Sequence, residues 1–118
     1  MYDKNNVFAK ILRNELPANK IYENEHALSF HSIGRAAEVH ALVIPKGEYV
    51  NMYDFAANAS PEEQVAFWEA VARAAELTNT TENFNAAVNS GVGPFRTGSV
   101  RHFHLHLLGG KALKADVD

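Results

Sequence analysis

Residues 100–110 of the chain are Val-Arg-His-Phe-His-Leu-His-Leu-Leu-Gly-Gly. Three histidines, His102, His104 and His106, alternate here with apolar residues, and successive side chains point to opposite faces of a β-strand. The pattern therefore predicts a strand over residues 100–108. One face of that strand would carry three imidazoles, and the other face would carry a phenylalanine and two leucines into the core.

The residues before this segment predict a mixed α+β domain. The run Ser60-Pro61-Glu62-Glu63 combines a hydroxyl N-cap, a proline at the first helical position and a glutamate that can close a capping box, so a long helix is expected to about Leu77. A short helix at residues 7–12 and strands at residues 20–24, 26–31, 39–44 and 84–89 complete the expected elements. Because the connections are short, we expect one domain over residues 1–118 with about five mostly antiparallel strands in one sheet.

The long helix also has a recognisable apolar pattern. Its apolar side chains recur at steps of three and four residues, at Val65, Trp68, Val71, Ala72 and Ala75. This spacing predicts that these five residues form the buried stripe of the helix.

The composition argues against several functional classes. The chain has 118 residues, a net charge of -3 and no cysteine. A basic surface for nucleic acid, a disulfide framework and thiolate chemistry are therefore not expected. There is no run of 18 apolar residues and no targeting pattern at the amino terminus, so we expect a cytoplasmic protein without a membrane partner.

Three chemical interpretations fit the histidines. They could form a polar face exposed to solvent, or they could share a metal ion, although Glu38 is the one nearby carboxylate that could support such ligands. In the third interpretation, a neutral imidazole near its reference pKa attacks phosphorus and carries a phosphoryl or nucleotidyl group.

The loop before the histidines favours the third interpretation. Gly91, Gly93 and Gly98 allow the backbone to approach an anion closely, and Thr97 and Ser99 add hydroxyl groups beside the histidines. A mobile surface turn is the alternative interpretation of the same loop.

These segments resemble the histidine triad superfamily. Residues 102–110 are similar to its H-x-H-x-H-x-x motif, and the trailing Gly109-Gly110 is similar to its Hint branch, the purine nucleotide phosphoramidases. Residues 8–24, 30–46 and 86–91 resemble that branch in the same order. The resemblance implies hydrolysis of nucleoside phosphoramidates or related AMP-linked compounds through a covalent nucleotidyl-histidine, with no required metal or other cofactor.

The resemblance also implies a role for each matching residue. His104 would attack the α-phosphorus, His106 would bind phosphate oxygens or the leaving group, and His102 would organise the triad. His40 matches a fourth histidine and Ser99 a hydroxyl near the leaving group, and these five residues form the implied catalytic set. The implied nucleotide-binding set is Phe8, Ile11, Leu16, Phe30, His31, Ser32, Ile33, Asn89, Gly98, Ser99, His104 and His106. For the apolar members and for His40, ordinary core packing is an alternative.

Two positions depart from the family pattern. Ser32 stands where the family usually has an aspartate that accepts the ribose hydroxyls, and Gly98 stands where it usually has a glutamine. We therefore expect the phosphorus chemistry to persist and ribose binding to weaken. The leaving group is not specified by the sequence.

The assembly and two alternative functions complete the expectations. Residues 84–89 carry no charge and no proline, so as an exposed sheet edge they would pair readily with another chain. The resemblance implies a homodimer through this strand and the long helix. The alternative functions are a purine nucleotide-binding module without turnover and a metal-binding protein that uses the three histidines.

Overall fold

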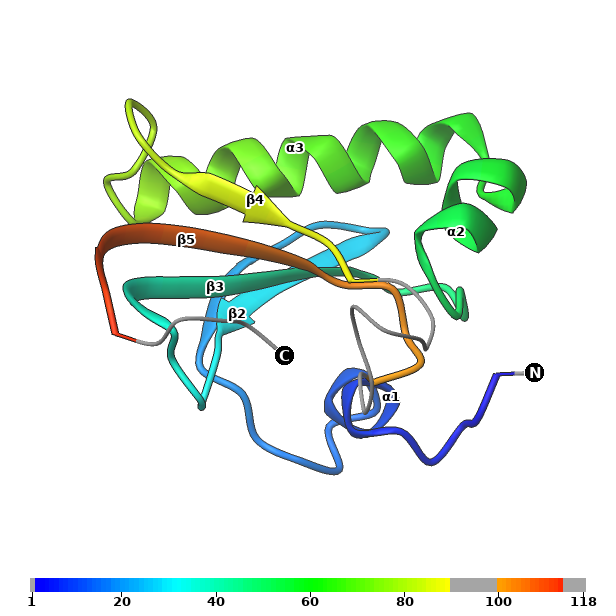
Figure 1. The fold of residues 1–118 in the computed structure, drawn as a ribbon. Helices are drawn as coiled ribbons and strands as arrows, with labels where there is room; N and C mark the ends of the chain where they lie inside the picture. Colours follow the sequence, from blue (N-terminus) through cyan, green and yellow to red (C-terminus); the bar gives the residue numbers. More distant parts are fainter. Residues whose placement is uncertain (1, 90–99, 114–118) are drawn as a thin grey trace.

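The fold is built on one antiparallel sheet (Figure 1), and the computed structural model describes residues 2–89 and 100–113. The strands are β1 (Lys20–Glu23), β2 (Ala27–His31), β3 (Ala37–Pro45), β4 (Asn85–Ala87) and β5 (Leu105–Ala112). Their order in the sheet is β1-β2-β3-β5-β4, and every neighbouring pair is antiparallel. The structure thus confirms the α+β fold with a single five-stranded sheet.

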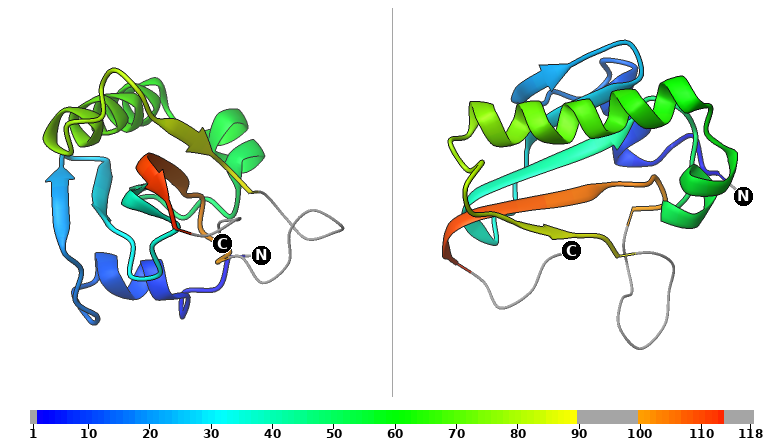
Figure 2. Two further views of the ribbon diagram at one scale, coloured as in Figure 1. Left: turned by 60° about the vertical axis from the view of Figure 1, so that its left-hand side comes forward. Right: turned by 90° about the horizontal axis from the view of Figure 1, so that it is seen from above.

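Within the described residues, three helices accompany the sheet: α1 (Val7–Leu12), α2 (Met52–Asn58) and α3 (Pro61–Leu77). Helix α3 lies along one face of the sheet and α1 lies on the opposite face (Figures 1 and 2). The predicted capping box is present, because Ser60 Oγ accepts from the Glu63 amide at 3.1 Å and Glu63 Oε1 accepts from the Ser60 amide at 3.0 Å. Helix α2, which was not predicted, begins after Asn51, whose side chain accepts from the Asp54 amide.

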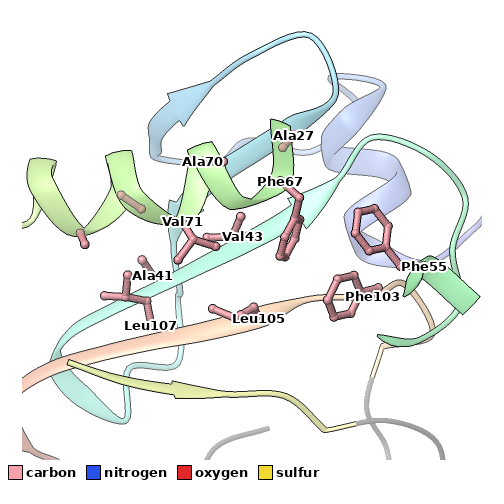
Figure 3. Packing of buried hydrophobic residues seen from close by; sticks show 12 residues of the cluster. Ala27, Ala41, Val43, Phe55, Phe67, Ala70, Val71, Phe103, Leu105 and Leu107 are labelled. Carbon is pink, nitrogen blue, oxygen red and sulfur yellow. The ribbon is translucent and has the colours of Figure 1, made fainter. Parts of the chain in front are cut away.

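The sheet is buried on both faces. Beneath α3, apolar side chains of β2, β3 and β5 pack with Phe67 of the helix, Phe55 of α2 and Phe103 (Figure 3). On the other face a smaller cluster joins α1 to the sheet and comprises Phe8, Ile11, Leu28, Phe30, Leu42 and Ile44. Because alternate residues of β3 enter the two clusters, this strand is apolar almost throughout.

The predicted buried stripe of α3 is wrong in three of its positions. The buried residues of the helix are Phe67, Ala70, Val71, Ala74 and Ala75. Val65 is 71% exposed, Trp68 is 54% exposed and Ala72 is also exposed. Steps of three and four residues fit both the predicted face and the face that is actually buried, because the two faces share Val71 and Ala75. The alanines at 70 and 74 let the backbone approach the sheet, and this selects the face that is buried.

The predicted histidine strand is also shifted. Strand β5 begins at Leu105 and continues to Ala112, so His102 and His104 precede it. In that preceding segment the Phe103 amide donates to the Tyr49 carbonyl at 2.7 Å, which ties the chain to the loop after β3 instead of to a strand. At the far end, Gly110 has a φ of 71°, and a Cβ on Gly109 would lie 2.5 Å from Thr80 Cγ2. Two consecutive glycines are therefore needed here.

The remaining boundaries differ by a few residues. Strand β4 is shorter than the predicted 84–89, and β3 is longer than the predicted 39–44. Among the described residues, no helix is both long and apolar enough to cross a membrane.

Candidate active site

A cavity of about 450 Å³ lies between α1 and the sheet. Its floor is formed by Phe30 of β2 and by His40 and Leu42 of β3, which share one face of the sheet, and α1 supplies Val7, Phe8 and Ile11. The other lining residues are Ser32, Ile33, Gly34, Val100, His104 and His106. Three of the four histidines expected in the catalytic set therefore meet at this cavity, and His102 is not among its lining residues.

His104 has a defined proton position. Its Nδ1 lies 2.8 Å from the main-chain oxygen of His102, and its ring packs edge-on against Phe8 with the centroids 5.0 Å apart. A carbonyl oxygen only accepts, so Nδ1 of His104 must carry the proton and donate it. In the neutral ring the lone pair suited to nucleophilic attack is then on Nε2.

His40 and His106 form a directed pair. The Ala36 amide donates to Nδ1 of His40 at 2.9 Å, and Nε2 of His40 lies 2.8 Å from Nδ1 of His106. Because Nδ1 of His40 accepts, its proton is on Nε2 and is donated to His106. In its neutral form His106 therefore carries its own proton on Nε2, which makes that nitrogen a donor.

His102 serves as an internal anchor. Its ring is fully buried, Nε2 lies 2.8 Å from the Pro45 carbonyl oxygen, and Nδ1 lies 2.6 Å from the hydroxyl oxygen of Tyr2. The carbonyl requires a proton on Nε2, so Nδ1 accepts from the Tyr2 hydroxyl. Burial lowers the pKa of His102 to about 4, which keeps the ring neutral near neutral pH.

Comparison with known proteins identifies the family. The family model described as the HIT domain matches residues 13–113. The chain belongs to the histidine triad (HIT) family. A HIT-like protein of Azospirillum brasilense is 44% identical over 112 residues, which cover 95% of this chain and 91% of that protein.

Solved structures of HIT proteins share the fold. A HIT family hydrolase from Clostridium thermocellum has a TM-score of 0.81 and 32% identity, covering 98% of this chain and 99% of that chain. A HIT family hydrolase from Legionella pneumophila has a TM-score of 0.74 and 30% identity, covering 94% and 97%.

The other residues expected in a HIT site occupy different places. Phe8, Ile11, Phe30, Ser32 and Ile33 line the cavity together with the three histidines. The side chain of His31 lies on the opposite face of β2 from Phe30, and His31 lines a neighbouring cavity of about 370 Å³. Leu16 is 39% exposed and lines a separate pocket formed by Ile11 and the segment between α1 and β1.

Three expected site residues, Asn89, Gly98 and Ser99, follow β4 in the sequence. Nδ2 of Asn89 is buried and has no hydrogen-bond partner among the described residues. Gly98 and Ser99 lie outside the described residues.

Sequence reasoning did not identify Tyr2 or the main-chain groups of Ala36 and Pro45. Tyr2 is 100 residues away from its partner, and main-chain groups carry no residue-specific signal.

The cavity between α1 and the sheet is lined by hydrogen-bonding side chains, namely three histidines and Ser32, and by apolar side chains. No aspartate or glutamate is among its described lining residues. Within residues 2–89 and 100–113, no group of three or more potential ligands is arranged to hold a metal ion. Glu38, the carboxylate considered for such a site, accepts from the Lys111 amide at 2.6 Å instead.

We predict that His102 makes stability depend on pH. A folded pKa of about 4 against an unfolded value of about 6.5 means that the unfolded chain binds the proton more tightly. The contribution of His102 is thus fully present above about pH 6.5 and falls by about 3 kcal/mol as the pH drops toward 4. In His102→Gln the amide can still donate to the Pro45 carbonyl but does not titrate.

Urea unfolding of both proteins between about pH 7 and pH 4.5 measures this difference. The variant should be less stable than the wild type at neutral pH, and the gap should narrow on acidification. A gap that stays constant over this range would contradict a neutral, buried His102.

Proposed function

We propose that the protein hydrolyses nucleoside phosphoramidates or related AMP-linked compounds, with His104 forming a covalent nucleotidyl-histidine. The observation that carries this proposal is the fixed proton arrangement at the cavity. Nδ1 of His104 donates to the His102 carbonyl oxygen, which leaves the Nε2 lone pair for attack on phosphorus. The names of two similar structures, HIT family hydrolases, support a hydrolytic reaction.

The first step forms a bond between Nε2 of His104 and the α-phosphorus and breaks the bond from phosphorus to the leaving nitrogen, which takes a proton from water. The Nε2 proton of His106 donates to a phosphoryl oxygen and stabilises the charge that develops there. In the second step water attacks the phosphorus, the bond to His104 breaks, and a nucleoside monophosphate is released. The attacking water loses a proton, which neutralises the hydroxide left by the first step. One water is consumed overall, and no step uses a metal.

The two neighbouring cavities suit a nucleoside. They share the lining residues Ile11, Phe30, Ser32 and Ile33. Aromatic and aliphatic side chains on both sides of this boundary can enclose a purine ring, as in other apolar ligand sites. The ribose would then lie near Ser32, which offers one hydroxyl in place of a carboxylate.

A purine nucleotide-binding module without turnover is the second candidate, and it predicts binding to the same cavity. The metal-binding alternative has less support. Both ring nitrogens of His102 are already engaged, one by the Pro45 carbonyl and one by the Tyr2 hydroxyl.

We predict that adenosine phosphoramidate is hydrolysed with or without a chelator and that His104→Ala abolishes turnover. Removal of a covalent nucleophile should reduce kcat by at least about a thousandfold. His104→Asn is the matched control for packing, because its amide can still donate to the His102 carbonyl. Both variants should remain folded and still bind AMP.

Release of AMP measures turnover, and thermal unfolding reports the fold. If His104→Ala retained about a tenth of the wild-type activity, another group would be the nucleophile. Tight nucleotide binding by a wild type that does not turn over would favour the binding module. A stoichiometric metal whose removal stops turnover would favour the metal-binding alternative.

We predict that Ser32→Asp lowers KM for adenosine phosphoramidate with little change in kcat. A ribose contact away from phosphorus stabilises the ground and transition states about equally, so it acts on KM. Steady-state kinetics of the two proteins measure this effect. An unchanged or higher KM would indicate that the ribose does not lie beside residue 32.

We also propose a homodimer through β4 and α3. The two sheet edges differ, because β1 presents Lys20 and Glu23 whereas β4 is uncharged. Glu69 of α3 accepts from Tyr22 of β1 at 3.3 Å, and Trp68 lies about 100° around the helix from Glu69, on the flank away from β1. By helical geometry the exposed Trp68 therefore faces the β4 side of the molecule, where it can contact a partner.

We predict that Ala86→Lys shifts the protein toward the monomer. Ala86 is exposed and opposes Leu107, so the substitution places a charge on the α3 side of β4. Ala87 opposes His106, and a lysine there would disturb the cavity as well. Sedimentation velocity at micromolar concentration measures the mass. A wild type that sediments at 13.0 kDa would refute the dimer.

A further inference from the structure

Tyr2 makes a contact that links the amino-terminal segment to the triad. Its hydroxyl oxygen lies 2.6 Å from Nδ1 of His102, and the two rings meet edge to face with their centroids 5.5 Å apart. Tyr2 is half-buried and is not among the residues that line the cavity. An effect of Tyr2 on the reaction can therefore pass through the His102 ring, which its hydroxyl contacts.

The ring of His102 has one acceptor and one donor nitrogen. Nε2 donates to Pro45, at the end of β3, so Nδ1 can only accept, and the Tyr2 hydroxyl is its donor. The two contacts hold the ring from opposite sides in the neutral state. Loss of the hydroxyl would leave a buried acceptor that must find another donor or take up a proton.

The main chain beside this ring orients His104. The peptide group between residues 102 and 103 accepts from Nδ1 of His104 through its oxygen, at 2.8 Å. The same group donates to the Tyr49 carbonyl through its nitrogen, at 2.7 Å. Because a peptide group is planar, a rotation at residue 102 would move the oxygen that holds the His104 ring.

We propose that Tyr2 is a positioning residue for His104: its hydroxyl holds the His102 ring, and the peptide group after His102 transmits that constraint to the nucleophile. The assignment rests on the proposed function for its catalytic consequence. The structural part, that Tyr2 sets the state of the two histidines, is testable without turnover.

Charge gives a second consequence. The titratable groups that face His102 are Tyr2, His104 and Glu48, while Phe8 packs against the ring from α1. A hydroxyl that donates to Nδ1 stabilises the neutral ring, so its removal lets His102 gain a proton at a higher pH than in the wild type. A cation at His102 would oppose the positive charge that develops on His104 as it attacks phosphorus.

The amino-terminal segment has other attachments, which provide a control. Lys4 Nζ lies 2.9 Å from Glu48 Oε2, and Arg13 donates to the Lys4 carbonyl oxygen at 2.8 Å. Lys4→Gln removes the exposed ion pair and leaves the contact between Tyr2 and His102 in place. If Tyr2 acted only as a tether for this segment, Lys4→Gln and Tyr2→Phe would have similar effects.

The experiment compares full-length wild type, Tyr2→Phe and Lys4→Gln in adenosine phosphoramidate hydrolysis from about pH 5 to 8.5. In Tyr2→Phe we expect kcat to fall about tenfold, KM to stay within about twofold, and the acid limb of kcat to move upward by about one pH unit. Lys4→Gln should match the wild type. Unchanged kcat and acid limb in Tyr2→Phe would overturn the catalytic role, as would equal losses in the two variants.

Nitrogen-15 NMR of the histidine rings provides the readout that does not depend on turnover. In the wild type His102 should be protonated on Nε2 and His104 on Nδ1. In Tyr2→Phe we expect the His102 Nδ1 resonance to shift and His104 to show a mixture of tautomers. If both rings keep their wild-type resonances, the positioning role is refuted, whether or not the protein hydrolyses phosphoramidates.

Discussion

The hydrogen bond from Nδ1 of His104 to the carbonyl oxygen of His102 is the constraint on which the site depends. It selects one tautomer and fixes the plane of a ring that is only 4% exposed. The carbonyl can orient His104 because the peptide group that carries it is fixed on both sides. The His102 ring is anchored to Pro45, and the Phe103 amide donates to Tyr49. In the proposed mechanism the side chain of His102 contributes through the backbone, which would let a histidine outside the cavity take part in the reaction.

Strand β3 connects this constraint to the rest of the fold. One face of the strand carries Ala41 and Val43 into the core beneath α3, and the other carries His40 and Leu42 to the cavity floor. Its last residue, Pro45, accepts from His102. A shift of β3 would disturb both histidine contacts at once, so the packing on the α3 side also maintains the site. The buried imidazoles are tolerated because their contacts satisfy polar groups that would otherwise be costly to bury.

The sequence predicted the sheet, helices α1 and α3, and the capping box of α3, because each depends on local spacing or local hydrogen bonds. It predicted that His102, His104 and His106 share one face of a strand; the rings of His104 and His106 are 5.1 Å apart, whereas His102 does not line the cavity. The sequence placed His102 and His104 within the strand. An alternating pattern does not show whether the main chain of a segment pairs with another strand or with a loop, and here the Phe103 amide bonds to the loop after β3. The face of α3 was assigned wrongly for a related reason: Val65 and Trp68 have helical spacing, but only the fit of Ala70 and Ala74 against the sheet decides which face is buried. The contact of Tyr2 with His102 depends entirely on tertiary structure.

The cavity is lined by two kinds of groups, imidazoles and apolar side chains. Nε2 of His106 is a donor in the neutral ring, so the end of the cavity near the triad suits the oxygens of a phosphoryl group. The end near Phe30 and Ile11 is apolar, and these two side chains cannot form hydrogen bonds with the hydroxyl groups of a ligand. In the proposed complex a ribose diol between them would meet Ser32, a neutral side chain, and a single hydroxyl binds a diol more weakly than a carboxylate that accepts two hydrogen bonds. Binding energy should therefore come mainly from the phosphoryl group and the base, so selectivity among sugars should be lower than selectivity for the phosphorus centre.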